Sequence, residues 1–221
     1  MSQLFEAVAS GDMETARSLA AAQPELREAR DADGLLPATR ALYSLDRQSA
    51  EDILPPDASL GLCEAAAFGR LPRMHELLRE DPARVNELST DGFTPLHLAC
   101  FSGGPAVTEA LIRRGADLER RSENRFARVR PLGTAVFSGD RESARLLLEA
   151  GADPNGQGEG GFTPLHSAAM NGDADLVRLL LSSGADAGLP LPDGRTAEHV
   201  AREGGHGECA RLLASEGAHT D

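Results

Sequence analysis

Apolar and polar positions along this chain follow a block that recurs about every 33 residues. In the clearest block, Pro164 suits the first turn of a helix, and Thr163 before it suits the N-cap. Small apolar residues follow as far as Gly172, a residue type that ends helices in a left-handed conformation. A second stretch, 175–181, carries a thick apolar stripe. Each block therefore predicts two short helices, and neither helix can bury its apolar face without a neighbouring block.

Two series of glycines fix the period of this pattern. The first series advances by steps of 36, 33 and 33 residues, at Gly103, Gly139, Gly172 and Gly205. The second series follows it twelve residues later, at Gly115, Gly151, Gly184 and Gly217. Two series with the same spacing predict stacked units of about 33 residues, each made of one supersecondary element.

Two of the blocks share a longer motif. Residues 91–99 read DGFTPLHLA and residues 161–169 read GFTPLHSAA, so both contain the TPLHxA core of the ankyrin repeat family, which the chain resembles. The resemblance is carried most fully by residues 88–217 and extends with more departures to 57–87. It implies an all-α solenoid of stacked helix-turn-helix repeats with short β-hairpin or turn fingers. It also implies a structural role for the histidines that share one slot, which are His97, His166 and His199.

Extended over the whole chain, the spacing predicts a single domain of about seven units with degenerate caps at both ends. The predicted limits are 1–32, 33–56, 57–88, 89–124, 125–157, 158–190 and 191–221. From Leu45 to Gly69 the step is only 24 residues, which predicts a shortened or absent finger, or a break between two stacks, at 55–61. From Gly103 to Gly139 the step is three residues too long, and the excess falls in the finger region 119–130.

The charge of the chain narrows the range of partners. The formal net charge is −13, and all 22 basic residues are arginine. Phosphate backbones and anionic membranes repel such a chain, so we expect no nucleic-acid or membrane partner. The N-terminus lacks a basic region followed by an apolar run, and no apolar run is long enough to span a bilayer. A cytoplasmic protein is therefore expected.

Nothing in the sequence predicts catalysis, a cofactor or a metal site. Histidines copied once per repeat cannot converge on one reacting centre. The three cysteines, Cys63, Cys100 and Cys209, are far apart, so we expect buried thiols and neither a disulfide nor a zinc site. The glycine-rich segment 156–161 is similar to a phosphate-binding loop, but it lacks a lysine and a preceding strand. It is expected to be a flexible finger tip.

Positive charge is concentrated in the segment 113–130. It holds seven arginines and three acids, so its net charge is +4, and it also contains Phe126. Arginine and aromatic residues are enriched at protein interfaces, which favours a binding loop that takes an acidic surface. The alternative is that these arginines pair with acids on neighbouring repeats, and the sequence leaves both interpretations open.

The family resemblance implies binding through the finger tips and the exposed side of the first helices. An apolar row at Phe68, Phe101, Phe137 and Met170 either lines the concave groove or is buried between repeats. Carried over to this chain, the predicted partner-binding residues are Asp91, Phe93, Phe101, Arg120, Arg121, Arg125, Phe126, Arg128, Phe162, Met170, Asn171 and Arg195.

The sequence therefore predicts a monomeric, non-catalytic protein-protein interaction module that holds a protein partner in its concave groove. A second hypothesis is an inhibitor or immunity-type regulator that covers the active site of one enzyme. A third is an ankyrin enzyme or small-ligand receptor, with its pocket at the notch around Pro55 and Pro56. The identity of the partner cannot be read from the residues.

Overall fold

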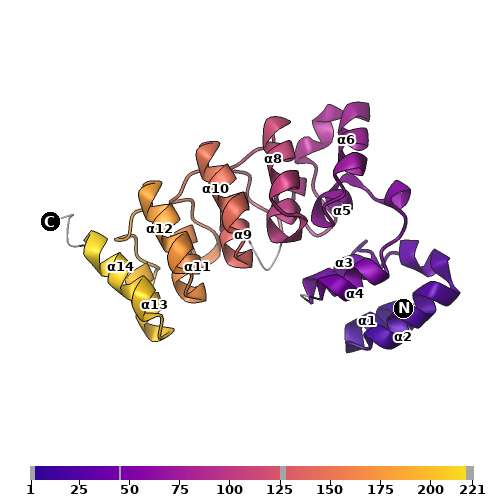
Figure 1. Cartoon of the computed structure of the whole chain (residues 1–221), viewed down its shortest axis with the longest axis horizontal. Coiled ribbons are helices and arrows are strands. Elements are labelled where there is room, and N and C mark those ends of the chain that lie inside the picture. The colour runs from indigo at the N-terminus through magenta and orange to yellow at the C-terminus, as the bar shows by residue number, and fades with distance from the viewer. Residues whose placement is uncertain (1–2, 45, 125–127, 218–221) are drawn as a thin grey trace.

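The computed structural model describes residues 3–44, 46–124 and 128–217, which form an arched stack of helix pairs (Figure 1). The pairs of the N-terminal half are α1 (Gln3–Ser10) with α2 (Met13–Ala22), α3 (Pro37–Tyr43) with α4 (Arg47–Asp52), and α5 (Leu62–Ala67) with α6 (Leu71–Glu80). Next, α7 (Pro95–Leu98) continues into a π-helical turn, η4 (Ala99–Gly103), and pairs with α8 (Pro105–Arg113). The last pairs are α9 (Pro131–Ser138) with α10 (Arg141–Glu149), α11 (Pro164–Asn171) with α12 (Ala174–Ser182), and α13 (Ala197–Glu203) with α14 (Gly207–Gly217).

Short 3₁₀ helices complete the fold: η1 (Pro24–Glu28), η2 (Asp57–Ser59), η3 (Pro82–Asn86) and η5 (Glu159–Gly161). The described residues contain no β-strand, so the expected all-α solenoid is confirmed, whereas its fingers are turns and not β-hairpins. Each turn is too short to form a ladder, and one backbone hydrogen bond joins its two ends. The unit limits drawn from the sequence stay a prediction.

Small residues allow the first helices of successive pairs to approach closely. Ala66, Ala99, Ala135 and Ala168 are fully buried along the stack. A Cβ at Gly103 would collide with the carbonyl oxygen of Ala66, so only glycine fits there. Leucines and valines of the second helices fill the remaining space, and the buried apolar residues form one cluster from Leu4 to Leu213. The stack is therefore held together by contacts between units that could not fold alone.

Each TPLH motif joins a turn to the helix that follows it and to the next turn. His97 accepts hydrogen bonds at Nδ1 from the backbone N–H (3.3 Å) and the hydroxyl (2.7 Å) of Thr94. Its Nε2 lies 3.0 Å from the carbonyl oxygen of Val129, which can only accept, so the proton resides on Nε2. His166 repeats the arrangement and contacts the carbonyl of Arg195. These histidines have the structural role that the resemblance implied.

The turns differ in length where the glycine spacing differs. Backbone bonds close the turns 31–35, 89–93, 158–162 and 191–195 between residues four apart. The turn 122–129 is closed by Ser122 N–H to Val129 O, between residues seven apart. The three additional residues predicted in the region 119–130 therefore fall inside this turn.

No such turn links α4 to α5; the chain passes through η2 instead. The turn 31–35 therefore meets 89–93 directly, and a Cβ at Gly34 would lie 2.8 Å from Cγ2 of Thr90. Thr39 occupies the slot that His97 occupies in α7, and its buried hydroxyl has no hydrogen-bond partner in the part of the chain described. We attribute this to the missing turn, which would have offered a carbonyl. Whether 55–61 is a domain break stays a prediction.

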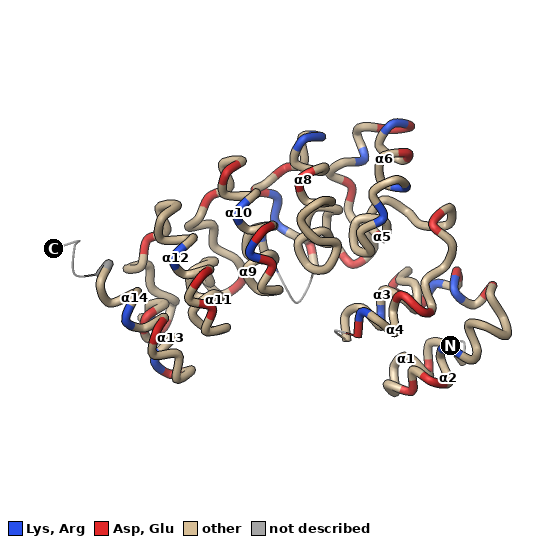
Figure 2. The backbone as a smooth tube through the Cα atoms, in the orientation of Figure 1, with Lys and Arg blue, Asp and Glu red and all other residues tan. Residues whose placement is uncertain are grey.

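Charged residues of both signs are interspersed along the stack (Figure 2). Several ion pairs join the second helices of successive units, among them Arg17–Asp52 (3.1 Å) and Arg141–Asp173 (3.0 Å). Their side chains are partly exposed, and each pair of this kind contributes about 0–1 kcal/mol. The ion pairs therefore select which units are neighbours more than they stabilise the stack.

The first prediction concerns pH. Burial lowers the pKa of His97 from its usual 6.5 to about 4, and it lowers the pKa of His166 as well. Between these pH values the unfolded chain binds a proton that folded His97 does not, so the free energy of unfolding falls as pH decreases from 6.5 to 4. Urea unfolding at pH 7, 5.5 and 4.5 measures this loss.

A His97→Gln variant is the control for the pH prediction. It cannot titrate at this position, so it starts less stable and loses less stability across the same pH interval. Equal losses in the parent and the variant would contradict the assignment of this pH dependence to His97.

Candidate partner-binding groove

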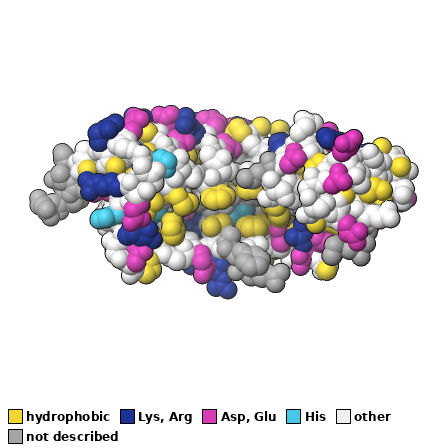
Figure 3. All heavy atoms as spheres, turned by 90° about the horizontal axis from the view of Figure 1, so that it is seen from below, with side chains coloured by type: hydrophobic (Ala, Val, Ile, Leu, Met, Phe, Trp, Pro, Cys, Tyr) yellow, Lys and Arg dark blue, Asp and Glu magenta, His cyan; other side chains and the backbone are white. Residues whose placement is uncertain are grey.

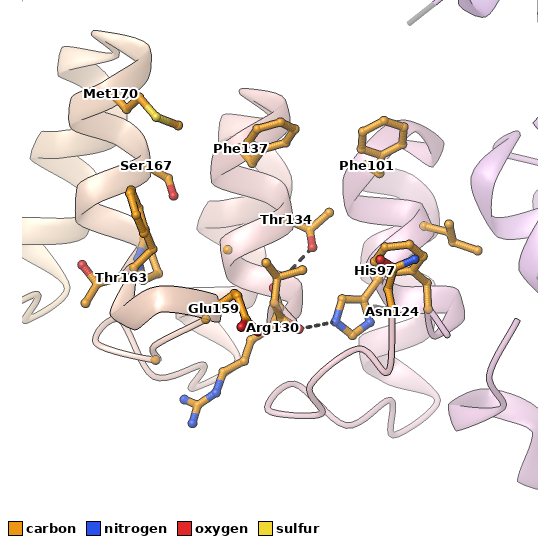
Figure 4. Close-up of a pocket in the computed structure, with 18 of the residues that line it drawn as sticks. His97, Phe101, Asn124, Arg130, Thr134, Phe137, Glu159, Thr163, Ser167 and Met170 are labelled. Carbon is orange, nitrogen blue, oxygen red and sulfur yellow. Dashed lines mark hydrogen bonds between the residues drawn. The ribbon is translucent and has the colours of Figure 1, made fainter. Parts of the chain in front are cut away.

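A groove of about 610 Å³ runs along the inner face of the arch, between the first helices and the turns that precede them. Figure 3 views this face and shows hydrophobic side chains gathered along its middle, with charged side chains toward the edges. The helices α7, α9 and α11 supply one wall and the turns 89–93, 122–129 and 158–162 the other (Figure 4). The large apolar side chains that line it are Phe93, Phe101, Val129, Phe137, Phe162 and Met170.

The apolar row at the ends of the first helices divides into buried and exposed members. Phe68 is 1% exposed and belongs to the core. Phe101 is half-buried, whereas Phe137 is 58% exposed and Met170 is 45% exposed. Phe137 and Met170 are the exposed large hydrophobic residues of the described chain, and they lie on neighbouring helices at the same groove. Exposed large apolar side chains in one groove are uncommon on proteins that stay single in solution.

Tyr43 closes the N-terminal end of the groove. Its ring meets Phe101 edge-on with 5.9 Å between the ring centroids. Its hydroxyl donates a hydrogen bond of 2.7 Å to the carboxylate of Asp91. Burial, with the neighbouring Asp91 charge, raises the pKa of Tyr43 well above its ordinary value, so the hydroxyl stays protonated. Tyr43 reaches these residues because no turn separates the second and third helix pairs.

Gly133 leaves a space in the floor of the groove. It occupies the slot held by His97 in α7 and by His166 in α11, four residues before Phe137. Among the described residues, the nearest neighbour of a Cβ at Gly133 would be the Cβ of Val129, at 4.0 Å. The missing side chain therefore deepens the middle of the groove, between the positions of the two histidine rings.

One rim of the groove is formed by the ends of the first helices. There, the residue after each of Phe101, Phe137 and Met170 donates a hydrogen bond to the helix of the preceding unit. Ser102 donates to the carbonyl of Ala67 (2.8 Å), and Ser138 donates to that of Cys100 (2.7 Å). Asn171 continues the series with its amide, which donates to the carbonyls of Val136 (3.2 Å) and Phe137 (3.1 Å). His206 ends it at the carbonyl of Met170. The side-chain amide of Asn171 is therefore used in hydrogen bonds within the protein.

Three of the seven arginines in the segment 113–130 pair with acids of the protein itself. Arg113 pairs with Glu109, Arg120 with Glu123, and Arg130 with both Glu119 and Asp153. These pairs agree with the interpretation that acids nearby balance the arginines. Three members differ: Arg121 donates to the carbonyl of Gln157 (2.8 Å), and Arg114 and Arg128 are exposed. None of the three makes an ion pair with a described residue. The predicted residues Arg125 and Phe126 lie outside the described residues.

The structure brings together four of the predicted binding residues. Phe93, Phe101, Phe162 and Met170 all line the groove. The rest of the described set lies outside its lining: Asp91, Arg120, Arg121, Arg128, Asn171 and Arg195. Of these, Asp91 is bonded to Tyr43, and Arg195 pairs with Asp193 (2.7 Å) and Glu203 (2.8 Å).

Sequence reasoning missed Tyr43, Val129 and Gly133 as lining residues. Gly133 did carry a signal, because it breaks the TPLH motif at its histidine. The place of Tyr43 depends on a contact with Asp91, 48 residues away, that no local pattern encodes.

Charged side chains are few in the lining of the groove. Its charged lining residues are Arg130 and Glu159, and Arg130 is already paired. Within the described ranges, no cluster of three or more histidine, cysteine or acidic side chains could hold a metal ion. Cys63, Cys100 and Cys209 are buried and unoxidised, and burial raises the pKa of each thiol. None of the helices in the described chain has both the length and the apolar character needed to cross a bilayer.

Comparison with known proteins identifies the family. A family model for ankyrin repeats in three copies matches residues 62–158 and 132–221, which is more than half of the chain. The chain therefore belongs to the ankyrin repeat family.

Its relatives are longer proteins that contain a similar segment. The rat ankyrin repeat and SAM domain-containing protein 6 is 30% identical over 138 residues, which are 62% of this chain and 14% of that protein. The human BCL-6 corepressor-like protein 1 is 28% identical over 138 residues, 62% of this chain and 7% of that protein. The human NAD-capped RNA hydrolase NUDT12 is 34% identical over 86 residues, 39% of this chain and 18% of that protein. The chain thus spans a small part of each relative.

Substitutions in the groove and in the core should have different effects on the free energy of unfolding. Phe137→Ser removes an exposed side chain, so the free energy of unfolding should change by only about 0.5 kcal/mol or less. Leu180→Ala in α12 removes a fully buried side chain and should cost about 2–5 kcal/mol. Urea unfolding of both variants measures the difference. A large loss of stability in Phe137→Ser would mean that this ring is part of the core.

Proposed function

We propose that this chain is a non-catalytic module that binds a protein partner in the groove between α7, α9 and α11 and the turns before them. The observation that carries the proposal is the exposure of Phe137 and Met170 on neighbouring helices of one apolar groove. Keeping such side chains in water is unfavourable, and burying them against a partner releases that cost. Ankyrin repeats in the relatives support a role in protein interaction.

The absence of converging reactive groups supports a non-catalytic role. Of the two charged lining residues, Glu159 is exposed on a turn, and Arg130 is held by Glu119 and Asp153. The match to the NAD-capped RNA hydrolase is limited to 86 residues, 18% of that protein, so its printed activity is not carried over to this chain.

The proposed setting is a monomer in the cytoplasm. Three buried free thiols suit a reducing compartment, where disulfides do not form. The net charge of −13 suits a protein that repels copies of itself. The charge that favours an acidic partner surface is local and comes from Arg121, which precedes the turn 122–129, and from Arg128.

The proposal is tested by affinity capture from the native source with two variants that each add one aspartate. Phe137→Asp places the charge in the groove, and Ala106→Asp places it on an exposed site of α8 outside the groove lining. The parent and Ala106→Asp should retain the same bound protein, while Phe137→Asp should lose it. Equal capture by the parent and both variants would show that the groove is not the binding site.

A further inference from the structure

We propose that the segment 55–61 is a hinge and that the first two helix pairs form a gate, which opens the N-terminal end of the groove when Tyr43 leaves Phe101 and Asp91. The gate rests on the proposed function, because it controls access to the same groove, whereas the hinge does not. Three observations carry the proposal: the slight backbone contact between α3 and α5, the charged contacts across this joint, and the position of Tyr43.

The second and third helix pairs stack less closely than other neighbouring pairs. Backbone approach is extensive between α1 and α3, between α5 and α7, and between α9 and α11, but it is slight between α3 and α5. The connection between α4 and α5 contains η2 and no closed turn, and its residues 56–59 are exposed. Figure 1 shows α1–α4 below the line of the later pairs. Because the units of a solenoid hold one another only through contacts with their neighbours, we expect this stack to open first at this joint.

Charged side chains hold the two parts together across the joint. Arg30 pairs with Glu64 (2.8 Å), and Arg70 pairs with Glu51. The side chains of both pairs are partly exposed, so salt weakens their attraction. The buried apolar cluster also continues across the joint, so opening exposes apolar surface and the closed form predominates.

Tyr43 connects this joint to the groove. It is the last residue of α3, and it contacts Phe101 with its ring and Asp91 with its hydroxyl. Rotation about 55–61 moves α3 as a body, because a hinge motion is absorbed by a few residues of the connection. Such a rotation withdraws Tyr43 from both residues and uncovers the Phe101 end of the groove. A partner that contacts Phe101 would favour the open form, since a ligand shifts an equilibrium toward the state that it binds more tightly.

The fluorescence of the chain tests the hinge without a label. The chain has one tyrosine and no tryptophan, so its intrinsic fluorescence comes from Tyr43. Acrylamide quenches this fluorescence by collision and so reports the exposure of the ring. From about 0.01 to about 1 M sodium chloride the Debye length falls from about 30 to about 3 Å, and the quenching constant should rise about twofold while the helical circular dichroism stays constant. A quenching constant that salt leaves unchanged would overturn the hinge.

An arginine substitution and its matched control test the charged contacts. Arg70→Gln removes the pair with Glu51, so its quenching constant at low salt should rise toward the high-salt value of the parent. Arg178→Gln removes an ion pair between α12 and α14, with Glu208, and should behave as the parent does. Equal quenching constants in the two variants would contradict the role of the charged contacts in holding the gate closed.

A disulfide across the joint supplies a locked form. A Cβ at Gly34 would lie 3.2 Å from the Cβ of Thr90, close to the separation of about 3.5–4.5 Å found in disulfides. The oxidised double variant Gly34→Cys, Thr90→Cys should keep Tyr43 shielded from acrylamide at both salt concentrations. The same variant with reductant should respond to salt as the parent does, and it controls for the strain of a cysteine at the positive φ of Gly34. Equal salt responses of the oxidised and reduced forms would overturn the hinge.

Capture of the native partner separates the gate from the proposed function. The oxidised double variant should capture less of the partner than the reduced one does. Equal capture by both forms would overturn the gate, while loss of capture by Phe137→Asp would still support the groove as the binding site. The fluorescence of Tyr43 requires no partner, so the hinge stands or fails on that measurement even if the proposed function fails.

Discussion

Every feature of this protein depends on one constraint: a pair of short helices cannot bury its own apolar face. The first helices are too short and too rich in alanine to form a core alone, so Ala66, Ala99, Ala135 and Ala168 are buried only because units stack. Contacts are consequently local, each unit with its neighbours. The groove also depends on stacking, because its walls come from three units and exist only while those units are stacked.

The same constraint explains how the TPLH motif connects structure with function. His97 joins Thr94 of its own unit to Val129 of the next turn, and so it ties the first helix to a turn that lines the groove. At Gly133 the connection is absent, and the groove is deeper at that point. The same position of the repeat therefore holds either a histidine that bonds to the next turn or a glycine that leaves room in the groove.

The sequence predicted the fold well because the period of the glycines and the TPLH motif are local signals. It predicted Phe93, Phe101, Phe162 and Met170 as groove residues for the same reason, since their positions within the repeat define their direction. It could not decide between Phe68 buried and Phe137 exposed, because both have the same place in the repeat and differ only in what covers them. Burial of this kind depends on the neighbouring units.

Charged side chains were the least predictable part of the site. Arg130 and Arg120 were candidates for a binding loop, yet acids brought close by folding hold them. Arg195 is held in the same way by Glu203. An arginine side chain is long enough to reach any of several nearby carboxylates. The spacing of a motif does not specify which carboxylate will be close to it. Among the described arginines of the segment 113–130, Arg114, Arg121 and Arg128 keep the unpaired character that composition suggested.

The absent turn between α4 and α5 gives the groove a direction. Because that turn is missing, Tyr43 reaches Phe101 and closes one end, while the series of helix ends continues past Met170 to α13. A bound segment longer than the groove can therefore emerge at one end alone. Adding a repeat on the C-terminal side would lengthen the binding surface, whereas adding one before Tyr43 would leave it unchanged. In this solenoid, the missing turn makes the two ends of the groove different although the repeats share one pattern.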